Sequence, residues 1–87
     1  MHVIETFAAP ETKAGRLFWL PAYVALSREV YRGFMASGET YEAMRFIGNC
    51  SARWGITKTC AEALLKGEAT YDINDDTVTV TRTVPEE

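Results

Sequence analysis

The hydrophobic period of this 87-residue chain changes from helical to strand-like at Gly67, and that change limits the folds open to it. From Pro21 to Gly67, apolar residues recur at steps of three and four, as on one face of an α-helix. After it, in TYDINDDTVTVTRTV, apolar and polar residues alternate, which is typical of a half-buried β-strand. The NDD in the middle of that stretch is a turn signal. The sequence therefore predicts an α+β fold, with a helical region followed by a C-terminal β-hairpin.

Three helical segments are expected in the middle of the chain. The first begins at Pro21, which suits a first helical turn, and ends near Gly38, which suits a left-handed C-terminal position. The second follows the N-cap candidate Thr40 and ends at Gly48, because glycine weakens a helix. A short third segment covers 50–54.

A fourth helical segment has the clearest boundaries. Gly55 precedes it, and Thr57 is its expected N-cap. Lys66 and Gly67 end it, since a basic residue and then a glycine are typical of a helix C-terminus. These signals predict a helix over 57–66, with Thr57 as its cap.

The N-terminal part of the chain has less pattern. HVIETF alternates weakly and is a candidate short strand, and the AAPETKAG that follows has the composition of a loop. The length and the 47% hydrophobic content suit one small domain. We expect strand, loop and helix in 1–38, a helix-turn-helix-like pair in 40–66 and the hairpin in 69–84.

One residue of the second hairpin strand departs from its pattern. Arg82 falls on the same face as Val78 and Val80, which are expected in the core. Arginine is rarely buried without a partner. We therefore expect the strand to leave the core, or to bulge, at Arg82.

The charge balance is acidic as a whole but uneven along the chain. The net charge is −3, whereas nucleic-acid-binding domains are usually basic. Residues 40–66 contain four basic and two acidic side chains, and residues 68–87 contain one basic and six acidic ones. The middle of the chain is therefore the part suited to nucleic acid.

Several classes of protein are disfavoured by the residues present. Cys50 and Cys60 match no zinc or redox spacing and are expected to be reduced, mostly buried thiols. The single histidine, His2, has no evident partner, so no enzyme, metal or cofactor is expected. The most apolar segment, LFWLPAYVAL, is far shorter than the roughly 20 residues of a membrane span. With no secretory signal, a cytoplasmic protein is expected.

The aromatic residues give a further expectation. Core packing is the usual role of such a series, and an exposed member would mark a protein interface. The series consists of Phe18, Trp19, Tyr23, Tyr31, Tyr41 and Trp54.

The order of helix, glycine turn, helix and hairpin fits a helix-turn-helix. This motif needs a small residue inside its first helix, a glycine at the turn and apolar residues on the facing sides. With Gly55 at the turn, the small residue is Ser51. The facing apolar positions are Cys50, Trp54, Ile56, Ala61 and Leu64.

Residues from about 41 to 85 also resemble the phage Cro repressor family. The resemblance lies in AMRF at 43–46, in the helix-turn-helix spacing and in the hairpin turn at 73–75. It implies a small DNA-binding transcriptional regulator that acts as a dimer on double-stranded operator DNA. By position, Arg53 would touch phosphate, and the residues facing the major groove would be Thr57, Lys58, Thr59, Ala63 and Lys66.

A second class of function remains open. Small acidic proteins without a cofactor also act by covering a surface of another protein, as a phage-encoded inhibitor of a host defence or regulatory protein would. The acidic C-terminal region would then compete with nucleic acid for a basic site on that partner. A homodimer is a natural way for so small a chain to add buried area in either case.

Overall fold

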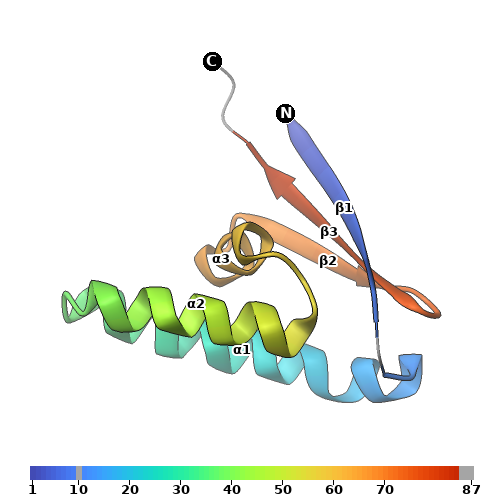
Figure 1. Cartoon of the computed structure of the whole chain (residues 1–87), viewed down its shortest axis with the longest axis horizontal. Helices are drawn as coiled ribbons and strands as arrows, with labels where there is room; N and C mark the ends of the chain where they lie inside the picture. Colours follow the sequence, from blue (N-terminus) through green and yellow to red (C-terminus); the bar gives the residue numbers. More distant parts are fainter. Residues whose placement is uncertain (10, 85–87) are drawn as a thin grey trace.

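The computed structural model describes residues 1–9 and 11–84 and has the α+β fold expected from the sequence (Figure 1). Three helices are inserted between the first strand of a small sheet and its last two strands. In chain order the elements are β1 (His2–Ala8), α1 (Lys13–Ala36), α2 (Thr40–Trp54), α3 (Lys58–Lys66), β2 (Ala69–Ile73) and β3 (Thr77–Thr83). The weakly alternating first strand and the hairpin are thus both confirmed.

Helix α1 begins earlier than the sequence indicated. Thr12 is its N-cap, and the Thr12 hydroxyl accepts a hydrogen bond from the backbone N–H of Gly15 at 3.2 Å. Pro21 therefore lies inside the helix rather than in its first turn, and part of the expected loop is helical. The cap and the burial of Arg16 and Leu20 hold these extra turns in place despite the proline.

Helix α2 is one continuous helix, so the predicted break at Gly48 and the separate helix at 50–54 are wrong. Ile47, Cys50 and Trp54 are buried on one face that crosses the glycine. Burial of that face outweighs the loss of about 1 kcal/mol that a glycine causes in a helix. The N-cap is Glu39, and Thr40 is already the first helical residue.

The sheet is antiparallel and has the order β1-β3-β2, so β3 is its central strand. The expected bulge at Arg82 does not occur, because Arg82 pairs in register with Val3 on β1 and Ala69 on β2. Arg82 remains on the inner face because its Nε donates to a carboxylate oxygen of Glu5 at 3.2 Å. The ion pair supplies the partner that the sequence pattern alone did not show.

The core lies between the helices and the inner face of the sheet. Helices α1 and α2 run side by side, and α3 lies between them and the sheet (Figure 1). Val80 on the central strand and Leu65 on α3 are fully buried, and Tyr31 of α1 and Trp54 of α2 close the same core. Among the described residues, none of the helices has the length and apolar character that crossing a membrane requires.

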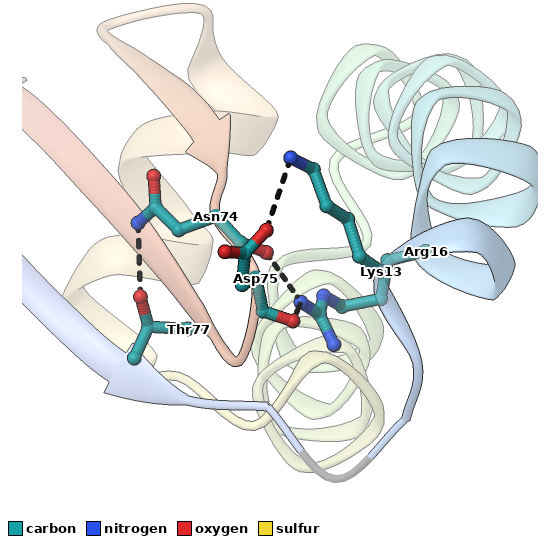
Figure 2. Close-up of polar contacts among 5 residues, drawn as sticks. All are labelled: Lys13, Arg16, Asn74, Asp75 and Thr77. Carbon is teal, nitrogen blue, oxygen red and sulfur yellow. Dashed lines mark hydrogen bonds and ion pairs between the residues drawn. The ribbon is translucent and has the colours of Figure 1, made fainter.

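A buried arginine ties the start of α1 to the hairpin turn, as Figure 2 shows. Arg16 is only 2% exposed, and its guanidinium donates to the backbone carbonyls of Asn74 at 2.7 Å and Asp75 at 3.0 Å. It also donates to the carbonyl of Glu11. On the surface, Lys13 pairs with the Asp75 carboxylate at 3.3 Å. These contacts fix the hairpin relative to the helices.

Candidate nucleic-acid interface

The turn between α2 and α3 is built around Gly55. Gly55 has a φ of 71°, in the left-handed region that favours glycine, and its N–H donates to the carbonyl of Ser51 at 2.9 Å. The next residue, Ile56, donates to the same carbonyl at 3.1 Å. Two donors on one carbonyl end α2 sharply, so the chain reverses within a few residues and α3 packs back onto α2.

The positions that a helix-turn-helix needs in its interior are buried. Ser51 is 8% exposed, and its hydroxyl donates to the carbonyl of Gly48 at 3.1 Å. This internal bond satisfies the polar group of the small residue between the two helices. The apolar positions buried with it are Cys50, Trp54, Ile56, Ala61 and Leu64.

Both ends of α3 are fixed. At the N-terminus, the Thr57 hydroxyl accepts a hydrogen bond from the N–H of Cys60 at 3.3 Å, so Thr57 is the N-cap that the sequence predicted. At the C-terminus, Gly67 has a φ of 78° and caps the helix. Arg28 of α1 donates to the carbonyl of Leu64 at 2.7 Å. A side chain presented on α3 therefore has a defined direction.

Three of the predicted DNA-contacting residues are exposed at the start of α3. Thr57, Lys58 and Thr59 all face solvent, and neither 1–9 nor 11–38 covers them. Lys58 makes no ion pair with any described residue. A lysine and two hydroxyls at a helix N-terminus, where backbone N–H groups also point outward, suit a phosphate group.

Two further predicted residues lie one and two turns along the same helix. Ala63 is half-buried, and Lys66 is exposed. Lys66 forms an ion pair with Glu62 at 2.7 Å, and that hydrogen bond and charge raise the pKa of Lys66. Beside Thr59, a shallow groove between α3 and the end of β3 is lined by Glu62, Lys66, Glu68 and Arg82. Charges of both signs therefore border this part of the helix.

The last predicted residue, Arg53, is at the end of α2 and is held by contacts within the chain. Its guanidinium lies 4.5 Å from the ring centroid of Trp19 and 5.6 Å from that of Tyr23. It also pairs with the Glu11 carboxylate at 3.2 Å, and Trp19 donates its indole N–H to the same carboxylate. Arg53 thus joins α2 to α1, and its contacts belong to a cluster separate from Lys58.

A polar cluster under α3 was not expected from the sequence. Cys60 is fully buried, and its thiol donates to a Glu5 carboxylate oxygen at 2.8 Å, the oxygen that also accepts from Arg82. The Cys60 hydrogen bond and the Arg82 charge lower the pKa of Glu5. Glu5 and Arg82 both lie at inward-facing positions of their strands. Two opposite charges at inward-facing positions are the sequence signal from which this ion pair could have been predicted.

The two thiols have the burial predicted for them. Cys50 and Cys60 are both free and buried, and burial raises the pKa of each thiol. A protonated, buried thiol is a poor nucleophile and a poor metal ligand. Among the described residues, no group of three or more His, Cys, Asp and Glu side chains is placed to hold a metal ion.

Comparison of the chain with protein-family models, with curated proteins and with solved structures finds no match.

Proposed function

We propose that this chain is a small DNA-binding regulator whose helix α3 enters the major groove of double-stranded DNA. The observation that carries the proposal is the exposure of Thr57, Lys58 and Thr59 at the capped start of α3, while the positions that join α2 to α3 are buried. In the helix-turn-helix mode, the N-terminal residues of the second helix are the ones that reach base edges.

The proposed roles follow from chemistry and placement. Lys58 contacts a phosphate or a guanine edge, because its ammonium is exposed and donates up to three hydrogen bonds. Thr59 contacts a base or a phosphate with its hydroxyl. Thr57 uses its hydroxyl as the helix cap, so it contributes to DNA mainly by fixing the direction of α3.

Two basic residues must give up contacts before they reach DNA. Lys66 must leave Glu62, which costs little because an exposed ion pair of this spacing contributes about 0.3–0.5 kcal/mol. Arg53 must leave the Glu11 carboxylate and the Trp19 ring. We therefore assign most of the DNA affinity to Lys58 and expect Arg53 to add little.

Affinity for a fluorescent duplex at low salt tests this function. Lys58→Ala should weaken binding roughly tenfold, since a contact to a charged group contributes about 1.5–3 kcal/mol at most and solvent screens part of it. The slope of log affinity against log salt should fall by about one. Arg32→Ala is the matched control, because Arg32 is an exposed cation on α1 that loses the same charge.

Two results would contradict the proposal. One is the absence of binding above that of an unrelated acidic protein. The other is equal loss of affinity in Lys58→Ala and Arg32→Ala, which would indicate an effect of net charge rather than of α3.

The acidic hairpin favours a second candidate, a non-enzymatic inhibitor that covers a basic surface of another protein. Asp72 and Asp76 are exposed near the β2–β3 turn, while Asp75 is paired with Lys13. A pull-down from bacterial lysate with the wild type and with Asp72→Asn/Asp76→Asn tests it. We expect a stoichiometric nucleic-acid-binding protein with the wild type alone. Recovery of no such protein would count against this candidate.

A further inference from the structure

The outward side of α1 is unusually apolar for a surface helix. Between Ala14 and Leu26 the only charged residue is Arg16, and that side chain is buried. Among the side chains left in solvent, Phe18 is 87% exposed and Leu26 is 65% exposed. A helix that is apolar on nearly all sides is normally buried on nearly all sides. Within the described residues, nothing covers this side of α1.

Four exposed apolar residues of α1 form one ridge, which we name the α1 ridge: Phe18, Ala22, Leu26 and Val30. They recur every fourth residue, which is the spacing along which helices pack ridge into groove. The ridge is about 18 Å long at the rise of an α-helix. Val30 at its far end is 44% exposed, so the whole ridge faces solvent.

We propose that the α1 ridge is the interface of a homodimer, with the α1 helices of two copies packed antiparallel about a two-fold axis. An axis between Ala22 and Leu26 brings Phe18 of one copy against Val30 of the other. It also brings the small Ala22 against the large Leu26. Each large side chain then meets a smaller one, so the ridge is complementary to itself, as a two-fold interface requires.

The charged residues of α1 agree with this arrangement. Glu29 and Arg32 pair with each other at 3.5 Å within one chain. The two-fold operation places Glu29 opposite Trp19 of the second copy and Arg32 opposite Arg16, whose side chain is buried within its own chain. No like charges are therefore brought together along the ridge, and an apolar second copy fits better than an acidic or basic partner.

Gly33 supports a close approach of the two helices. A side chain at this position would meet no atom within 4 Å, so no contact within the described chain requires the glycine. Glycine weakens a helix, and its presence here has no internal cause. In the antiparallel pair, Gly33 lies opposite Gly15 of the second copy, and both helix ends can approach without a clash.

The available area suits a weak dimer. Helix α1 is about 36 Å long, close to the 38 Å longest extent of a molecule that is only 16 Å across its shortest axis. The exposed parts of the ridge and of the neighbouring Tyr23 amount to roughly 500 Å² per copy. Stable interfaces begin at about 600 Å² per partner, and weaker complexes bury less. The ridge therefore suits a dimer that forms at high protein concentration.

Sedimentation equilibrium of the full chain up to roughly 200 μM tests the proposal. We expect the wild type to approach twice the 9.7 kDa mass of one chain. Leu26→Asp should remain at the mass of one chain, with an unchanged circular dichroism spectrum. Met44→Asp is the matched control, because Met44 is 67% exposed on α2, away from the ridge, and this variant should still dimerise.

Complementary charges test the pairing itself. Ala22→Glu alone and Leu26→Lys alone should each stay monomeric, and an equimolar mixture of the two should recover the dimer mass. A monomeric wild type would overturn the proposal and assign the ridge to a different protein. A dimer that Leu26→Asp leaves intact, or a mixture that stays monomeric, would overturn the two-fold pairing. Because mass is measured without DNA, failure here is distinguishable from failure of α3 to bind DNA.

Discussion

At the scale of single residues, the Glu5 carboxylate has the most consequential surroundings. The same Glu5 oxygen accepts one hydrogen bond from the Cys60 thiol and a second from Arg82, so β1, α3 and β3 meet at this atom. The sequence placed Arg82 against the core and indicated a bulge, because it showed the unfavourable position without showing the partner. The register of β1 with β3 supplies that partner 77 residues away.

The low pKa of Glu5 makes its contribution to stability depend on pH. The Cys60 hydrogen bond and Arg82 hold the pKa below its usual 4.5, so the contribution is full above that value and is lost as pH falls through the folded-state pKa. Glu5→Gln should therefore unfold at lower temperature than the wild type at neutral pH, and the difference should shrink below about pH 4. Thermal unfolding across pH checks this. A difference that grows with acidity would contradict it.

At the scale of elements, sequence patterns located helices better than they located helix ends. Thr57, Gly55 and Gly67 mark α3 correctly because a cap and two left-handed glycines are local features. Pro21 and Gly48 suggested helix ends that do not exist, because a helix tolerates either residue when a buried face continues across it. The exposed residues of α3 can be predicted from the helical spacing of its apolar residues. The contact of Arg53 with Trp19 depends on how α1 packs against α2, and no local sequence pattern indicates it.

Two substitutions distinguish a glycine that a helix merely tolerates, Gly48, from one that the backbone conformation requires, Gly55. Gly48→Ala should raise the free energy of unfolding by about 0.5–1 kcal/mol, because the new Cβ would meet only the Lys58 Cε, at 3.8 Å. Gly55→Ala should lower it by about 1–2 kcal/mol, because φ is 71° there. Urea unfolding followed by circular dichroism measures both. Destabilisation by Gly48→Ala would indicate that α2 does break at that residue.

At the scale of the whole molecule, contacts distant in sequence hold the sheet onto the helices. Arg16 is the clearest case, since a buried guanidinium at the start of α1 is bonded to the carbonyls of the hairpin turn (Figure 2). The arrangement leaves α3 exposed on one side of the molecule and the α1 ridge exposed as well. The surface proposed for DNA and the surface proposed for a second copy therefore lie on different helices.

Removing the Arg16 guanidinium should loosen that arrangement. Arg16→Met leaves the carbonyls of Glu11, Asn74 and Asp75 without the buried guanidinium that donates to them, so we expect a loss of about 2–4 kcal/mol in the free energy of unfolding. Arg32→Met, on the exposed side of α1, should change it by less than about 0.5 kcal/mol. Equal effects of the two substitutions in urea unfolding would show that Arg16 does not hold the hairpin.

The central claim, that α3 is the DNA-binding element, is tested most directly by NMR shift mapping of the isotope-labelled chain with a short duplex. The predicted result is that DNA shifts the backbone signals of Thr57, Lys58 and Thr59 more than any others. In Lys58→Ala, the same amount of DNA should leave the signals of this segment almost unshifted. Signals of the acidic turn, such as Asp75 and Asp76, should stay in place. Shifts confined to α1 or to the hairpin, or no shifts at low salt, would contradict the claim.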